Sequence, residues 1–324
     1  MRRSTTLALA LSLAAAALLA PGCTWSDLDA EFLAAMPERV DLHVDPPTST
    51  AQSSQGLQSG DLGQSRSGLQ ADAFLNLDNM AKQLNAWIDG LTGGLDLVRQ
   101  NPPSIRENDR RTWGPWEDKD HPGKEMRVVV AKTADGYTYS VEWRAKGSTA
   151  DFVPVITGKF AGETAAGGSG SFTLDMDKAR EADIAGPSTD PKIEIQTFTL
   201  GYTHDAQAVT VTLDEVVLRV ATGATETLHF GHQRNADQSG AFDYTYTMPN
   251  NGWTVAASAR WLSSHAGRVD GTAKNWFGDV VARQTDCWDE NLEVVYHFQD
   301  YDCGPLPTQT KCETGDASKC ALAP

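Results

Sequence analysis

The four cysteines near the C-terminus have the most readily predicted chemistry in this sequence. Cys287, Cys303, Cys312 and Cys320 lie 16, 9 and 8 residues apart. They include no C-x-x-C pair, so a zinc site is the weaker interpretation. An even number of cysteines in an oxidising compartment indicates disulfides. A hairpin turning at 289–291 would place Cys303 on the order of 33 Å from Cys287, too far for a bridge. We therefore expect nested bridges, 287–320 and 303–312.

Histidines and acidic residues give no metal motif. His229 and His232 are three residues apart on a predicted strand, so their rings point to opposite faces. We interpret them as surface or turn histidines. Segment 116–121 is acidic and could hold calcium, but it lacks the D-x-D-x-D-G order of a calcium loop. We interpret it as a solvated turn, and predict neither a metal ion nor another cofactor.

Motifs for nucleophilic catalysis are also absent from the sequence. It contains no G-x-S-x-G elbow and no Ser-x-x-Lys pair. The glycine-rich segment 167–170 is not followed by the lysine and helix of a phosphate-binding loop. We therefore expect a protein that is not an enzyme. The alternative is a secreted hydrolase acting on glycans, with carboxylates that the sequence cannot pair and tryptophans that stack on sugar.

Nine tryptophans stand out in the composition. Most lie in or beside predicted strands, where aromatic residues commonly pack against neighbouring strands. We favour packing over an aromatic-lined cavity or a carbohydrate-stacking face. The tryptophans concerned are Trp113, Trp116, Trp143, Trp253, Trp261, Trp276 and Trp288.

Most of the histidines and tryptophans named above are expected to lie in or beside strands, because apolar and polar residues alternate over much of 111–300. The alternation is strict in 137–145, 172–176, 209–213 and 242–248, which indicates half-buried strands. Eight shorter segments bring the total to about twelve: 126–132, 152–160, 193–203, 225–232, 253–262, 269–276, 279–286 and 292–298. No long helical pattern interrupts them. The fold class is therefore mainly β, an antiparallel curved sheet or half-open barrel with one covering N-terminal helix.

That helix is expected within 69–100. Its apolar residues recur every three or four positions: Phe74, Leu77, Ala81, Leu84, Ile88, Leu91, Leu95 and Val98. Gly90, Gly93 and Gly94 weaken the second half, so the secure part is about 70–92. The stripe could be a coiled-coil seam, but its short length favours a helix lying across the sheet.

The helix is either a structural plug or a lid over an apolar ligand. Close packing against the strands would make it a plug, which we favour, and looser packing would make it a lid. For the lid, the apolar ligand contacts are expected at Phe74, Leu84, Ile88, Trp143 and Tyr244.

Charge and hydropathy exclude several classes of protein. The 324 residues include 27 Lys and Arg against 43 Asp and Glu, a net charge of −16. Phosphate backbones need a basic face, so nucleic acid is excluded as a partner. The apolar run 7–20 is too short for a stable membrane span.

The N-terminus resembles the signal of a bacterial lipoprotein precursor. A basic start, Met1-Arg2-Arg3, precedes the apolar run 7–20, and Gly22-Cys23 follows as in a lipobox. Ala20 departs from the aliphatic residue usual at that place in the family. The resemblance implies a signal peptide at 1–22, acylation of Cys23 and anchoring in the outer membrane of the cell envelope. The alternatives are an ordinary secretory cut that leaves Cys23 free, or an uncleaved anchor.

The rest of the chain completes the expected organisation. Residues 23–68 read as the acylated cysteine and a flexible low-complexity tether, and 301–324 as a disulfide-stapled tail. The architecture is similar to the half-open barrels of periplasmic lipoprotein carriers, and the whole chain to uncharacterised β-rich envelope lipoproteins. We expect an envelope lipoprotein with a structural or binding role. Its expected partners are the membrane, through the acyl chains, and a lipid or other apolar ligand.

Overall fold

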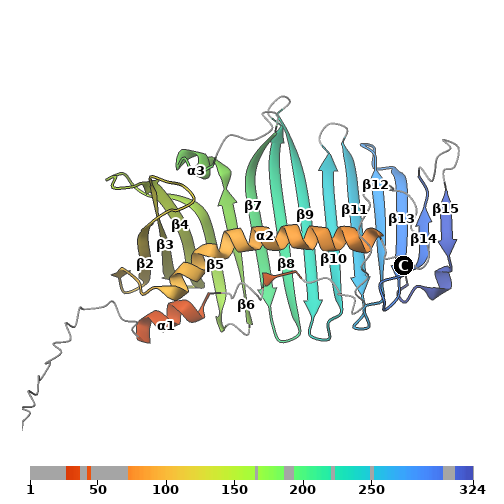
Figure 1. The fold of residues 1–324 in the computed structure, drawn as a ribbon, viewed down its shortest axis with the longest axis horizontal. Coiled ribbons are helices and arrows are strands. Elements are labelled where there is room, and N and C mark those ends of the chain that lie inside the picture. Colours follow the sequence, from red (N-terminus) through yellow and green to blue (C-terminus); the bar gives the residue numbers. More distant parts are fainter. Residues whose placement is uncertain are drawn as a thin grey trace, which may run out of the picture.

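The computed structural model describes residues 27–36, 42–44, 72–164, 167–185, 193–219, 223–248, 252–301 and 311–323. Its strands form one antiparallel sheet of fifteen strands, in which each strand pairs with the next along the chain. Figure 1 shows this meander as a broad sheet with α2 lying lengthwise across one face. We call this the inner face and the opposite one the outer face.

The strands have from 2 to 12 residues, and α3 lies between β6 and β7 in the chain. They are β1 (Ile105–Arg106), β2 (Arg110–Glu117), β3 (Lys124–Thr133), β4 (Gly136–Ala145), β5 (Val153–Thr164), β6 (Gly167–Asp175), β7 (Ile193–His204), β8 (Ala208–Arg219), β9 (Ala224–Asn235), β10 (Gly240–Met248), β11 (Trp253–Trp261), β12 (Gly267–Lys274), β13 (Val280–Trp288), β14 (Val294–Gln299) and β15 (Cys312–Gly315). The helices are α1 (Asp27–Ala34), α2 (Asp72–Gln100), α3 (Met176–Glu181) and the 3₁₀ helix η2 (Ala317–Lys319).

The mainly β, antiparallel class is confirmed, while the number of elements differs from the prediction. All twelve predicted segments overlap strands of the sheet, and β1, β2 and β15 are additional. β2 was missed because its register shifts between Trp113 and Trp116, around Gly114-Pro115, which breaks the alternation. β1 and β15 have only two and four residues. The sheet does not close, and such short strands at its two edges offer few free backbone groups for unwanted pairing.

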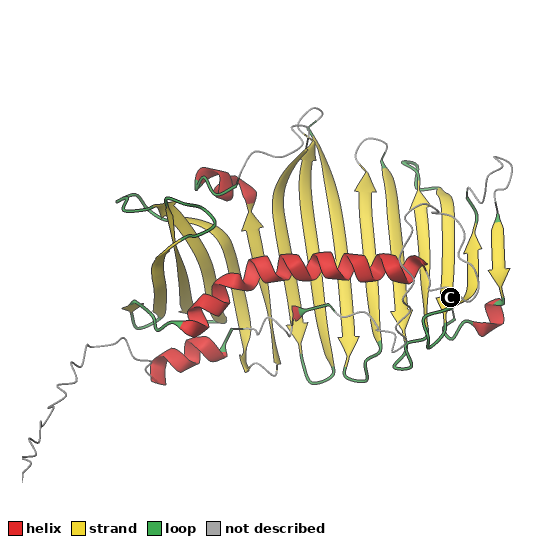
Figure 2. Ribbon diagram, viewed as in Figure 1, coloured by secondary structure: helices red, strands yellow, loops and turns green. Residues whose placement is uncertain are grey.

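The apolar stripe of α2 packs against the inner face (Figure 2). Its buried members are 0–3% exposed: Ala81, Leu84, Ile88, Leu95 and Val98. The side chains of Phe74, Leu77 and Leu91 lie outside the described part of the structure. α2 thus lies along the sheet, but the expectation of one covering N-terminal helix is wrong, because α1 also packs its side chains into this core.

The expected weakening of α2 at its glycines is wrong, because the helix continues to Gln100. A Cβ at Gly94 would lie 3.0 Å from the Tyr139 hydroxyl oxygen and 3.1 Å from Val141 Cγ2. Glycine here lets the helix approach the sheet closely, and tertiary packing offsets its low helix propensity.

Part of the segment expected to be a flexible tether is packed into the core. α1 occupies 27–34, and Phe32 and Met36 are each 2% exposed. Leu42 and Val44 are each 1% exposed. The prediction of a tether is therefore wrong at 27–36 and 42–44, where apolar side chains reach the core. Its other residues lie outside the described part.

Aromatic rings lie over glycines of neighbouring strands on the inner face. A Cβ at Gly240 would come within 2.3 Å of the Trp261 ring, and one at Gly267 within 2.3 Å of the Trp288 ring. Glycine leaves room for the ring to cover the adjacent strand, which adds apolar burial without thickening the core. This supports the packing interpretation for both tryptophans.

The C-terminal tail folds back onto the sheet. Cys287 and Cys320 form the expected disulfide, with their Cα atoms 5.4 Å apart. Cys312 is also disulfide-bonded, while Cys303 lies outside the described residues. The 303–312 pairing therefore stays a prediction. Cys287 lies opposite Tyr296 of β14, next to a shift of the register between Cys287 and Trp288.

Candidate functional site

Five residues were expected to contact an apolar ligand, and the four whose side chains the structure describes do not form one pocket. Leu84, Ile88 and Trp143 are 3, 0 and 8% exposed, and all belong to the continuous core. Tyr244 on β10 is partly buried and six strands away from Trp143 on β4, a separation of about 29 Å at 4.8 Å per strand. The described apolar side chains of α2 that face the sheet are buried in this same core.

The acidic turn at 116–121 uses its buried carboxylate internally. Asp118 Oδ2 accepts a hydrogen bond from Trp143 Nε1 at 2.7 Å and lies 2.8 Å from His121 Nδ1. Asp118 Oδ1 caps the backbone N–H groups of Asp120 and His121. Burial works to raise the pKa of Asp118, but hydrogen bonds from His121 and Trp143 outweigh it and lower the pKa below its usual range. The turn is thus a structural one.

Within the described residues, no group of three or more His, Cys, Asp or Glu could hold a metal ion.

The two predicted surface histidines have different environments. His229 is exposed and its Nδ1 lies 2.7 Å from Asp214 Oδ1. His232 is 2% exposed and stacks on Trp261, with ring centroids 5.9 Å apart. Burial and the charge of Arg234 lower the pKa of His232 to about 4. The prediction of a surface position is therefore wrong for His232, because its ring points to the inner face and packs against Trp261.

Two carboxylates approach each other on the inner face. Burial raises the pKa of Glu215 and the charge of Glu226 raises it further. Glu226 is 6% exposed and its Oε2 accepts a 2.6 Å hydrogen bond from the Tyr246 hydroxyl. Burial raises the pKa of Tyr244, and the negative charge of Glu215 raises it further. Sequence reasoning could not pair these residues, since they lie on three separate strands, β8, β9 and β10.

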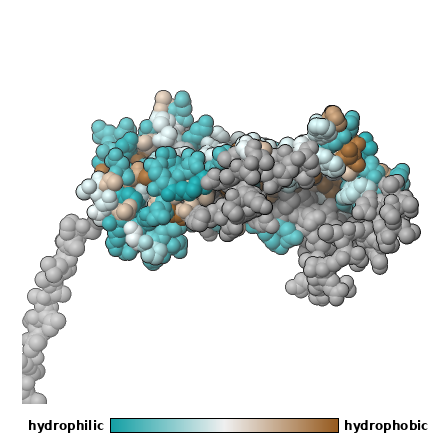
Figure 3. Space-filling model, turned by 90° about the horizontal axis from the view of Figure 1, so that it is seen from above, coloured by the Kyte–Doolittle hydropathy of each residue, from teal (hydrophilic) through white to brown (hydrophobic). Residues whose placement is uncertain are grey.

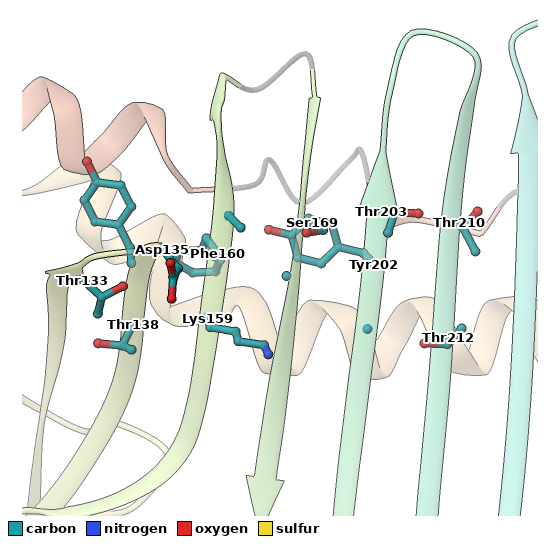
Figure 4. A pocket seen from close by; sticks show the side chains of 14 residues that line it. Thr133, Asp135, Thr138, Lys159, Phe160, Ser169, Tyr202, Thr203, Thr210 and Thr212 are labelled. Atoms are coloured by element: carbon teal, nitrogen blue, oxygen red, sulfur yellow. The ribbon is translucent and has the colours of Figure 1, made fainter.

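One hollow among the described residues lies on the outer face and takes its lining from β3 to β8. Its volume is about 580 Å³. Figure 4 shows the labelled side chains along neighbouring strands, with α2 passing behind them. Its lining combines the rings of Tyr137, Phe160 and Tyr202 with six Ser and Thr hydroxyl side chains: Thr133, Thr138, Ser169, Thr203, Thr210 and Thr212. We call this the hydroxyl groove.

Two glycines, Gly170 and Gly201, are among the lining residues and add no side chain to the groove. Gly201 faces Thr212, and a Cβ at Gly201 would lie only 2.7 Å from Thr212 Oγ1. The charged lining residues are Lys159 and Asp135. Neither of them forms an ion pair with any residue that the structure describes. The polar residues that alternate along the predicted strands indicated a solvent-exposed face of the sheet. They did not indicate a hollow on that face.

A second hollow of about 660 Å³ joins the hydroxyl groove to α1. Thr133, Asp135 and Tyr137 line both hollows. Glu31 of α1 lines the second and pairs with Lys132. The groove is therefore continuous with the surface beside the N-terminal helix.

No family model, curated protein or solved structure matches this chain. None of the described helices has the length and apolar character needed to span a membrane.

Proposed function

We propose that this protein is a lipid-anchored protein of the bacterial envelope with a structural or binding role rather than an enzymatic one. The observation that carries the proposal is the close packing of α2. Leu84, Ile88 and Val98 are at most 3% exposed, which supports a helix that plugs the inner face. Binding would then use the outer surface, where the hydroxyl groove lies.

The anchor is assigned to Cys23 because the sequence before it resembles a lipobox. Several acyl chains at one cysteine hold a protein at a membrane without a spanning helix. Cys23→Ser should move the protein from the membrane pellet to the soluble fraction. Ala20→Leu, which restores the aliphatic residue of the lipobox, is the matched control and should stay in the pellet. A Cys23→Ser protein that still pellets, with an intact mass that retains residues before Cys23, contradicts the anchor.

The runner-up within this function is a carrier that holds an apolar ligand between α2 and the sheet. It requires α2 to lift from the core, against the burial of Leu84 and Ile88. Native mass spectrometry of protein purified from its own host separates the two versions. A stoichiometric lipid that resists delipidating washes supports the carrier, and its absence supports the plug.

A second function, glycan hydrolysis, is favoured by one observation, the raised pKa of Glu215 beside the carboxyl group of Glu226. A carboxyl group whose pKa is raised next to a second carboxyl group is the arrangement of an acid–base pair. The aromatic side chains beside them are tyrosines rather than the tryptophan floor we expected for such an enzyme. Release of reducing sugars from envelope glycans that is abolished by Glu215→Gln, and retained by Asp214→Asn on the same strand, would establish this function instead.

A further inference from the structure

α1 is fixed firmly to the sheet at the end of the chain that carries the proposed anchor. Asp29 is fully buried, and its carboxylate accepts hydrogen bonds from Arg111 Nε at 2.8 Å and from the Arg106 guanidinium at 3.0 Å. Phe32 packs edge-on against Tyr137, with ring centroids 5.5 Å apart. α1 is therefore held to the sheet by a buried ion pair and by an aromatic contact.

The proposed anchor is only a short stretch of chain from α1. Three residues separate Cys23 from Asp27, the first residue of the helix. Four Cα–Cα steps span at most about 15 Å, and one helical turn adds about 5 Å to reach Glu31. Glu31 lines the hollow that continues into the hydroxyl groove. An acylated Cys23 thus keeps this end of the sheet close to the lipid headgroups.

The groove offers charges of both signs among neutral hydroxyls. Lys159 supplies an ammonium group and Asp135 a carboxylate, and neither has an ion-pair partner among the described residues. Lys132 is engaged by Glu31 instead. A lysine with threonine hydroxyls around it can donate hydrogen bonds to phosphate oxygens, and a carboxylate can accept them from an amine.

We propose that the hydroxyl groove binds the zwitterionic headgroup of a membrane phospholipid, one that carries a phosphate and a primary amine. Lys159 pairs with the phosphate, Asp135 with the amine, and Thr138, which lies opposite Lys159 on β4, donates to a phosphate oxygen. The headgroup has no net charge, so the net charge of −16 does not repel it as it would a free phosphate. Anchoring at Cys23 also raises its effective concentration at the groove. The inference that the headgroup comes from the membrane rests on the proposed anchor. The chemistry of the groove does not depend on that anchor.

Native mass spectrometry of the acylated full-length protein tests this directly. The protein is released from nanodiscs that contain equal amounts of phosphatidylethanolamine and phosphatidylglycerol, and the retained lipids are identified. We expect one retained phosphatidylethanolamine, preferred over phosphatidylglycerol by about tenfold, the effect of one charged contact. Lys159→Gln should release both lipids. Asp135→Asn should erase the preference, because phosphatidylglycerol lacks the amine.

Lys119→Gln is the matched control, because Lys119 is exposed and lies outside the groove. Equal retention in Lys159→Gln and Lys119→Gln would overturn the site. Soluble phosphoethanolamine, added to the acylated protein in phosphate-free detergent micelles, tests the source. Binding at the concentration that the headgroup has in nanodiscs would overturn the membrane as its source. An unacylated intact mass contradicts the proposed anchor, whereas an acylated protein that retains no phosphatidylethanolamine contradicts the headgroup site alone.

Discussion

Asp29 of α1 and Arg111 of β2 form a buried ion pair, with Arg111 Nε donating to Asp29 Oδ1 at 2.8 Å. The side chain of Asp29 is fully buried and that of Arg111 is 4% exposed. Arg111 also lies over the Phe32 ring, 4.5 Å from its centroid. Residues 82 positions apart in the sequence thus fix the first helix to the sheet.

Asp29→Ala should destabilise the protein by about 3–5 kcal/mol, because it leaves the guanidinium of Arg111 buried without its partner. Equilibrium denaturation by urea measures this loss. Glu31→Gln, which removes the exposed ion pair with Lys132, is the matched control and should change the free energy of unfolding little. Equal effects of the two variants would show that α1 is not held by Asp29.

Leu84→Ala should cost about 2–5 kcal/mol, because the large side chain is 3% exposed in the helix–sheet core. Asn79→Ala, at an exposed position of the same helix, is the matched control and should have almost no effect. Thermal denaturation of both variants checks this. A loss below about 1 kcal/mol for Leu84→Ala would favour a loosely seated lid.

Gly267→Ala should destabilise the sheet by about 1–3 kcal/mol, because the new Cβ overlaps the Trp288 ring. Gly271→Ala lies on the same strand, where the nearest atoms to a new Cβ are 3.9 Å away. Its effect should be close to zero. Denaturant unfolding of the pair separates ring packing from the general effect of removing a strand glycine.

His232 should make the fold sensitive to acid. Its pKa falls from 6.5 in the unfolded chain to about 4 in the folded protein, so between these values the unfolded chain binds more protons. Stability should therefore fall as the pH drops from 6.5 to 4, by on the order of 3 kcal/mol. His232→Phe should remove this part of the pH dependence, and it also replaces two ring nitrogens that have no hydrogen-bond partner. His229→Phe, at an exposed position, should leave it unchanged. An identical pH profile for His232→Phe and the parent would contradict the assignment.

A hydrophobic fluorescent probe should bind the outside of the protein and not its helix–sheet interface. Trp276 and Phe277 are 72% and 74% exposed at the β12–β13 turn, and apolar surface gathers toward this end of the sheet in Figure 3. Trp276→Ser with Phe277→Ser should abolish probe binding while leaving stability within about 0.5 kcal/mol. Saturable binding that survives in this double variant would indicate an internal apolar cavity and support the lid.

The sequence alone determined the elements whose patterns are local. Alternation over 137–145 and 242–248 predicted strands there, and the three-and-four spacing from Ala81 to Val98 predicted α2 and its buried side. Backbone geometry imposes these periods on any half-buried strand or helix, so a window of about ten residues suffices to detect them.

The tertiary structure decided which residues meet. α1 is only eight residues long, and its place in the core depends on Phe32 reaching Tyr137 and on Asp29 reaching Arg111. The hydroxyl groove draws its lining from separate strands, and the burial of His232 depends on what covers the inner face. None of these leaves a periodic signal, because the contacts join residues far apart in the chain and their free energy arises only once the sheet has brought them together.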